Sequence, residues 1–387
     1  MLKNSLFLAL VLGGTAALAD VEVRIVYLQQ AVEHPPTLSN LDPIPEDLGV
    51  AGALVGLDDN RTTGRFLGRT YEMDIVTIAP GGEWEAGVVE ALSRSDLVVL
   101  DAPADQIGAA LAVEGAADAL FFNVSAPDLA LREDACAPNL LHTLPSVAME
   151  TDALTQFFVK RRWTDLAMVV GTQEGDLAYA EAMRQSATKF GLRIRAEKTW
   201  AFDADMRRNA AQEIPIFTQD FPDHDALVVV DTIDDFDRYI AFNTWLPRPV
   251  TGTDGLTAVA WAPVVEQWGA AQLQSRFVES ATRPMRPGDY AAWAAIRTLG
   301  EAVTRTSSSD ASVLRAYILS DTFELAGFKG RPMTYRPWNG QLRQPIPLVH
   351  ARALVANAPL EGFLHQHTEL DTLGIDAPES SCTAFTE

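Results

Sequence analysis

Short apolar runs alternate along the chain with longer segments in which apolar and polar residues recur at helical spacing. The runs are rich in Val, Ile, Leu and Phe, which favours strands that are buried on both faces. The expected strands are 21–28, 70–80, 95–105, 119–128, 165–172, 226–231 and 248–253. The expected helices are 45–60, 85–94, 108–117, 149–163, 175–191, 234–245, 263–281 and 289–306. This alternation predicts an α/β fold in which helices flank mostly parallel sheets.

The alternation changes near residue 255, after which two helices follow one another. Segment 323–349 then predicts a pair of antiparallel strands with Asn339–Gly340 as the turn between them. A chain of 387 residues exceeds the usual size of a single hydrophobic core, so we expect two lobes.

The N-terminal segment 1–19 is interpreted as a signal peptide. Lys3 supplies a positive charge, an apolar run follows, and Ala17-Leu18-Ala19 is a small-residue site for cleavage after Ala19. No later run approaches the ~20 apolar residues that a membrane span needs. We therefore expect an exported protein in a bacterial periplasm.

Acidic residues outnumber basic ones by 52 to 30, which gives a formal net charge of -22. Such a surface repels nucleic acid and anionic lipid and attracts cations, although solubility alone is an alternative explanation. The two cysteines, Cys136 and Cys382, predict one disulfide in an oxidising compartment, which would hold the C-terminal tail against the body of the protein.

Several segments, in their order, resemble the type I periplasmic binding proteins of the branched-chain amino-acid class. They are 45–76, 121–133, 140–171, 288–303 and 328–349. Three further segments, "ACAPNLLHTLPS", "EQWGAAQLQSRF" and "RPMRPGDYAAWAAIRTLGEA", resemble a subfamily of ABC-transporter binding proteins. Members of that subfamily accompany alcohol dehydrogenases that depend on pyrroloquinoline quinone (PQQ), and related transport systems are linked to lanthanide uptake.

The resemblance implies two lobes joined by three crossovers, with the ligand between the lobes at the carboxyl ends of the strands. We expect lobe 1 to comprise 20–143 and 255–330, and lobe 2 to comprise 144–254 and 331–360, with 361–387 as a tail. The crossovers are expected near 142–146, 252–255 and 330–334. A permease of an ABC importer in the inner membrane and a small ligand or metal ion are the implied partners, and no enzymatic activity is expected.

Polar residues stand at the expected strand ends, where the family holds its ligand. The candidate ligand-binding residues are Asp101, Asn123, Ser125, Asp176, Asp231, Thr232 and Asp254. By resemblance, amino-acid binders carry one acidic residue and two aromatic residues at these positions, whereas this chain carries four aspartates. Converging carboxylates repel one another unless a cation lies among them, and Ca²⁺ or a lanthanide prefers such oxygen ligands. The tentative metal ligands are Asp101, Asp176, Asp231 and Asp254, with Glu46 and Glu174 in reserve.

Other interpretations remain open for these residues. Asp176 and Asp231 both precede helices and could simply cap them, and Asp237 falls in the first turn of an expected helix, where acids are common. The cargo could instead be a small organic acid, an amino acid or an alcohol-derived metabolite, or the protein could be a sensor or assembly partner of the dehydrogenase. His365 and His367 could meet a metal or belong to a solvated tail. The usual catalytic motifs, such as G-x-S-x-G and H-E-x-x-H, are absent from the sequence.

Overall fold

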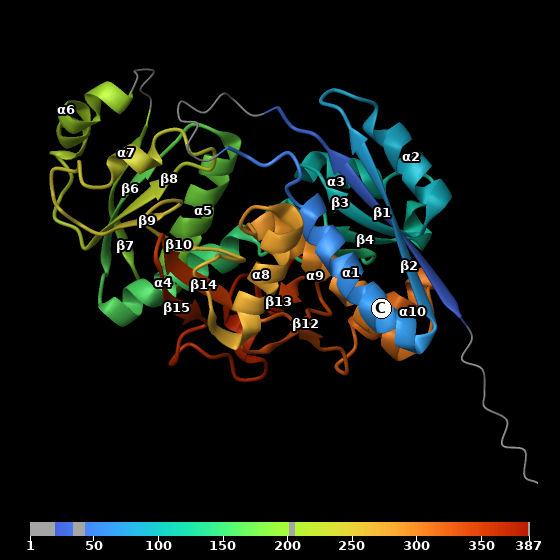
Figure 1. Ribbon diagram of the computed structural model, residues 1–387. Coiled ribbons are helices and arrows are strands. Elements are labelled where there is room, and N and C mark those ends of the chain that lie inside the picture. Colours follow the sequence, from blue (N-terminus) through green and yellow to red (C-terminus); the bar gives the residue numbers. More distant parts are fainter. Residues whose placement is uncertain (1–19, 34–42, 201–205, 386–387) are drawn as a thin grey trace, which may run out of the picture.

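The computed structural model describes residues 20–33, 43–200 and 206–385. The expected signal peptide and most of the proline-rich segment at 33–45 lie outside the described residues. Two lobes lie side by side, each built on its own sheet (Figure 1). No described helix has the length and apolar character needed to cross a membrane.

The first lobe contains a five-stranded parallel sheet in the order β2-β1-β3-β4-β5. Its strands are β1 (Val21–Gln30), β2 (Arg69–Ile78), β3 (Leu97–Asp101), β4 (Leu120–Asn123) and β5 (Leu140–His142). Its helices are α1 (Val50–Leu67), α2 (Trp84–Arg94), α3 (Ala104–Leu111), α8 (Ala270–Ala281), α9 (Pro287–Thr306) and α10 (Ala311–Ile318). Alternate residues of β1 face opposite cores: Ile25 packs with α1, α8, α9 and α10, and Val26 packs with α2 and α3.

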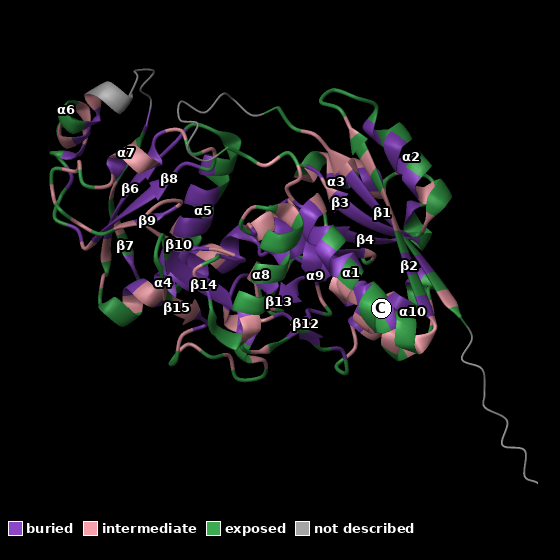
Figure 2. Ribbon diagram, viewed as in Figure 1, coloured by how far each residue is buried: buried purple, intermediate pink, exposed green. Residues whose placement is uncertain are grey.

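The second lobe contains a seven-stranded sheet in the order β15-β14-β10-β9-β8-β6-β7. Its strands are β6 (Asp165–Val170), β7 (Arg193–Thr199), β8 (Ala226–Val230), β9 (Val250–Gly252), β10 (Leu256–Ala258), β14 (Ile346–His350) and β15 (Ala353–Ala358). The helices α4 (Val147–Arg161) and α5 (Glu174–Lys189) cover one face, and α6 (Met206–Thr218) and α7 (Asp237–Ile240) cover the other. The strands of both sheets are largely buried, whereas the outer helix surfaces are exposed (Figure 2).

A small antiparallel sheet completes the fold, with β11 (Leu325–Ala326), β12 (Pro332–Tyr335) and β13 (Leu342–Arg343). The expected turn at Asn339–Gly340 is confirmed, because β12 and β13 pair across it. Short 3₁₀ helices are also present: η1 (Ala116–Asp118), η2 (Ala130–Arg132), η3 (Gln267–Gly269) and η4 (Glu369–Thr372). The predicted disulfide between Cys136 and Cys382 is confirmed.

The chain crosses between the lobes after β5, after β10 and between β13 and β14. The boundaries expected at 255 and 331 therefore differ from the observed ones. Strand β10 pairs with β9 and β14 in the second lobe. Met333, Tyr335 and Leu342 of the hairpin are buried in the core of the first lobe, so packing of these side chains keeps the hairpin there.

Some predicted elements differ from the observed ones. The expected helix 234–245 is reduced to the four residues of α7, because Phe242 takes a left-handed conformation, with φ at 67°, and interrupts it. Strand β7 and helix α6 were not expected; β7 is an edge strand whose sequence, RIRAEKT, has little apolar character. Helix α1 begins at Val50, five residues later than expected from Pro45.

Helices α1 and α9 make a close backbone contact in the first lobe. A methyl group added at Gly52 would lie 1.9 Å from the carbonyl oxygen of Asp289, which leaves no room for any side chain. The backbone N–H of Gly49 donates to Asp289 Oδ1 at 2.9 Å. The Arg283 guanidinium donates to both oxygens of the same carboxylate, at 2.7 and 2.9 Å.

We expect Gly52→Ala to lower the free energy of unfolding by about 1–3 kcal/mol, because the added methyl group forces the two helices apart. Gly108→Ala is the matched control, since nothing lies within 4 Å of a methyl group there and alanine favours a helix over glycine by about 1 kcal/mol. Denaturant unfolding measures both changes. Equal stability of the two variants would contradict the close contact.

Candidate functional site

The candidate residues lie on two sheet edges. All strands of the first sheet are parallel, and β5 leads directly into the first crossover, so the carboxyl edge of that sheet faces the junction between the lobes. Asp101 and Asn123 are the last residues of β3 and β4 on this edge, and Ser125 follows β4. The remaining candidates, Asp176, Asp231, Thr232 and Asp254, lie on or beside the carboxyl edge of the second sheet.

Asp101, at the end of β3, is held by two residues of the adjacent strand β1. Its Oδ2 atom accepts hydrogen bonds from the Tyr27 hydroxyl at 2.8 Å and from Gln29 Nε2 at 3.0 Å. Burial raises the pKa of Asp101, although these hydrogen bonds act against the rise and the nearby Asp289 adds to it slightly. The edge therefore presents a carboxyl group whose orientation is set by β1.

Asn123 and Ser125 act mainly within the loops that they belong to. Asn123 Oδ1 accepts from the backbone N–H groups of Ser125 and Ala126, at 3.1 and 2.9 Å. The Ser125 hydroxyl donates to the carbonyl of Ala102 at 2.9 Å and accepts from its N–H at 2.8 Å. These side chains fasten the loop after β4 to the loop after β3 and thereby fix the backbone beside Asp101.

Asp176 holds two loops of the second lobe together. Its Oδ2 atom accepts the backbone N–H of Gln173 at 2.9 Å, which caps α5. Its Oδ1 atom accepts both the N–H and the hydroxyl of Thr232, each at 2.7 Å. The carboxylate is 1% exposed, so both oxygens are occupied by this structural role.

Asp231 closes the turn that follows β8. Its Oδ2 atom accepts from the backbone N–H groups of Phe236 and Asp237, at 2.5 and 3.0 Å. Burial raises the pKa of Asp231, and the neighbouring Asp176 adds to the rise, while the N–H donors oppose it. For both Asp176 and Asp231 the capping interpretation describes the observed contacts.

The four aspartates are not gathered into one coordination sphere. Asp101 belongs to the first sheet, and the other three belong to the second. Within the described ranges, no group of three or more His, Cys, Asp or Glu side chains is arranged to hold a metal ion. In the tail, His365 Nε2 lies 3.3 Å from Asp376 Oδ2.

Asp237, expected to be an ordinary helix acid, is a buried carboxyl group at this edge. It is 2% exposed, and burial raises its pKa to about 8, with further contributions from Asp231, Asp234 and Asp254. The Thr253 hydroxyl lies 3.1 Å from Asp237 Oδ2. Its burial could not be read from the sequence, because the expected helix continues past the point where the real one ends.

A second polar cluster, Glu150, Tyr179 and Lys329, was also missed. Glu150 is in the first turn of α4, and burial raises its pKa to about 8, although the charges of Lys329 and Arg132 oppose the rise. Lys329 is 3% exposed. Its Nζ atom donates to the Pro345 carbonyl at 3.1 Å and to Gln344 Oε1, both in the third crossover.

The Tyr179 hydroxyl completes this cluster from α5. The residue is 7% exposed, and its hydroxyl has no hydrogen-bond partner among the described residues. Burial raises the pKa of Tyr179, and the nearby Glu150 contributes. An unpaired buried hydroxyl costs free energy, so a ligand or water that accepts from it would be stabilised. The sequence does not reveal this cluster, because a single Glu or Tyr inside an amphipathic helix gives no sign that it will be buried.

We expect the stability of the wild-type protein to fall relative to Asp237→Asn as the pH rises from 4 to 8. Below the pKa of an unfolded aspartate, about 3.9, both states hold the proton and the folded protein is not penalised. Towards pH 8 the unfolded chain has lost its proton while the folded protein keeps it, so unfolding is favoured by about 1.4 kcal/mol for each unit of pKa difference. Urea unfolding at several pH values measures this. A constant difference between the two proteins would show that Asp237 is ionised when folded.

No protein-family model matches the sequence. Comparison with the curated proteins finds no match either. Solved structures, in contrast, resemble the chain over almost its whole length. One is a branched chain amino acid ABC transporter periplasmic ligand-binding protein from Burkholderia xenovorans LB400, with a TM-score of 0.71 and 13% identity, covering 94% of this chain and 100% of that chain.

Two other structures are similar to the same extent. An ABC transporter substrate-binding protein from Sphaerobacter thermophilus has a TM-score of 0.69 and 16% identity, covering 91% of this chain and 99% of that one. A solute binding protein of an ABC transporter from R. palustris, in complex with benzoate, has a TM-score of 0.65 and 13% identity. The match covers 93% of this chain and 99% of that chain. The chain therefore has the α/β fold of the type I periplasmic binding proteins, as predicted.

Proposed function

We propose that this protein is the substrate-binding component of an ABC importer, exported to the periplasm and delivering its ligand to a permease in the inner membrane. The observation that supports this most directly is the architecture itself. Two lobes with mostly parallel sheets meet at the carboxyl edges of their parallel strands, and three crossovers join them, which is the arrangement in which hinge closure can trap a ligand.

The favoured cargo is a small organic acid. At neutral pH the Glu150 carboxyl, with its pKa of about 8, holds a proton, so Glu150 at the start of α4 and Tyr179 on α5 both offer O–H donors. A ligand carboxylate accepts such hydrogen bonds well. The half-buried Asp101 on the other lobe would accept from a hydroxyl or amino group of the same molecule.

The link to alcohol oxidation rests on the sequence resemblance, and the cargo class agrees with it. Oxidation of an alcohol produces an aldehyde and then a carboxylic acid, which is the kind of ligand that these O–H donors would recognise. Benzoate, the ligand of one structural neighbour, is also a carboxylate. Co-purification with a permease would support transport, whereas capture of a dehydrogenase alone would favour a sensor or assembly role.

We expect a panel of small carboxylic, hydroxy and amino acids to contain a ligand that raises the melting temperature, because a ligand that binds only the folded state stabilises it. Tyr179→Phe should lower the affinity for that ligand about tenfold or more, because one hydrogen bond to a charged group is lost. Affinity should also fall above pH 8, where Glu150 loses its proton.

Tyr317→Phe, on α10 of the first lobe, is the matched control and should leave the affinity unchanged. Isothermal titration calorimetry measures each affinity. If Tyr179→Phe binds the acid as tightly as the wild type does, the proposed contact is wrong; if no acid in the panel binds, the cargo class is wrong.

A hard cation is the second candidate, because the nearby charges of Asp231 and Asp254 raise the pKa of the buried Asp237 and a cation would offset this repulsion. We expect titration of metal-depleted protein with La³⁺ and Ca²⁺ to show no stoichiometric binding at micromolar concentration, since Asp176 and Asp231 already accept backbone hydrogen bonds. Micromolar binding that disappears in Asp101→Ala with Asp254→Ala would instead establish the cation as cargo.

A further inference from the structure

The C-terminal strap, residues 369–385, first packs against the second lobe. Leu373 is fully buried in the core under α4 and α5. The N–H of Gly374 donates to Asp152 Oδ2 at 2.8 Å, and its carbonyl accepts from Lys189 Nζ at 2.9 Å. Leu373 and Gly374 therefore anchor the strap in the second lobe.

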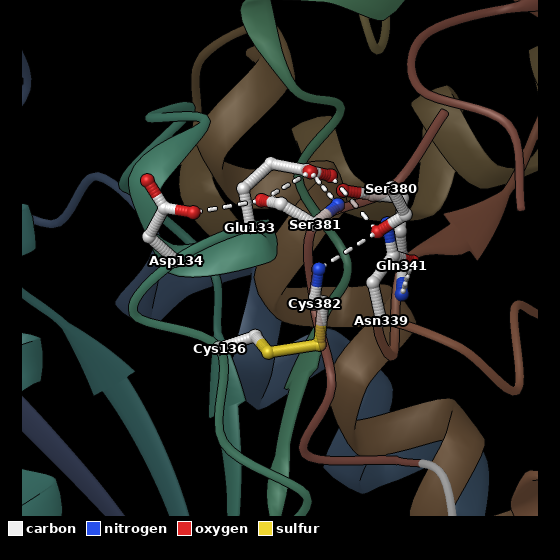
Figure 3. The surroundings of a disulfide bond; sticks show 8 residues. All are labelled: Glu133, Asp134, Cys136, Asn339, Gln341, Ser380, Ser381 and Cys382. Atoms are coloured by element: carbon white, nitrogen blue, oxygen red, sulfur yellow. Dashed lines mark hydrogen bonds between the residues drawn. A yellow bond between two sulfur atoms is a disulfide. The ribbon is translucent and has the colours of Figure 1, made fainter. Parts of the chain in front are cut away.

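The end of the strap is fastened to the first lobe (Figure 3). Glu133 accepts hydrogen bonds from the Ser380 hydroxyl at 3.1 Å and from the Ser381 N–H at 2.6 Å. Cys382 then forms the disulfide with Cys136, which lies 246 residues earlier, in the segment between β4 and β5.

Around its first attachment the strap also lies against the crossovers. Asp371 accepts from Arg336 Nε at 3.0 Å and from Arg343 Nε at 2.8 Å, and both arginines belong to the hairpin that leads into the third crossover. A methyl group at Gly374 would lie 2.8 Å from Met149 Cγ and 3.5 Å from Ser146 Oγ, beside the first crossover. The strap thus follows the hinge closely.

We propose that the strap is a fourth, covalently closed connection between the lobes and that it limits their relative rotation. Lobes joined only by three crossovers open by changes in backbone angles at a few hinge residues. A segment anchored in the core of one lobe and disulfide-bonded to the other permits only those rotations that keep both anchors in place. The inference goes beyond the proposed function and needs no particular ligand.

The test is the distribution of distances between the lobes. Spin labels on non-natural amino acids at Val89 on α2 and Leu177 on α5, both exposed, report on the first and second lobes. Double electron–electron resonance should give a narrow distribution for the intact protein. In Cys136→Ser with Cys382→Ser we expect the distribution to broaden and its mean to shift.

Two further samples separate the effect of losing the disulfide from misfolding of that double variant. Addition of a thiol reductant to the folded, labelled protein should broaden the distribution in the same way. Glu133→Gln with Ser381→Ala removes hydrogen bonds of the anchor but keeps the disulfide, so its distribution should stay narrow. An unchanged distance distribution after disulfide cleavage would overturn the proposal, even if the melting temperature falls. The disulfide would then have a purely stabilising role. Because no ligand is present in this experiment, its result is independent of the proposed function.

Discussion

One buried side chain, Arg132, holds together the segments through which the chain leaves the first lobe. Its guanidinium donates to Gln341 Oε1 at 2.6 Å and to three backbone carbonyls, those of Ala126, Asp128 and Leu144, at 3.1, 2.8 and 3.1 Å. One group thereby joins the loop after β4, the first crossover and the central hairpin. A buried charge is tolerated only with such satisfied hydrogen bonds, and here they hold the first crossover and the hairpin against the loop after β4.

The sequence predicted the architecture better than the site. Alternating apolar strands and amphipathic helices, the Asn339–Gly340 turn and the cysteine pair each depend on local pattern or simple chemistry, and all three agree with the structure. The lobe boundaries failed because pairing of β10 and burial of Tyr335 are long-range events. The pattern of apolar residues along the chain does not indicate which of the two lobes will bury a given segment.

The site shows the same limit in a sharper form. The positions of Asp101 and Asp231 at strand ends, and of Asp176 at the start of α5, followed from the topology, but the number of hydrogen bonds that each carboxylate accepts did not. Glu150 and Asp237 look like ordinary helix acids in the sequence, yet their surroundings keep them protonated near neutral pH. The formal net charge of -22 counts both of these groups as ionised.

The close contact between α1 and α9 has a use in finding relatives of this protein. It requires Gly49 and Gly52, three positions apart, together with Asp289, whose carboxylate accepts from Gly49 across 240 residues of sequence. Arg283 completes the set by neutralising that carboxylate. These four positions form two pairs that are far apart in the sequence, so the combination can be looked for where overall identity is as low as 13%. A chain that carries all four residues at these spacings has the groups that this helix contact needs.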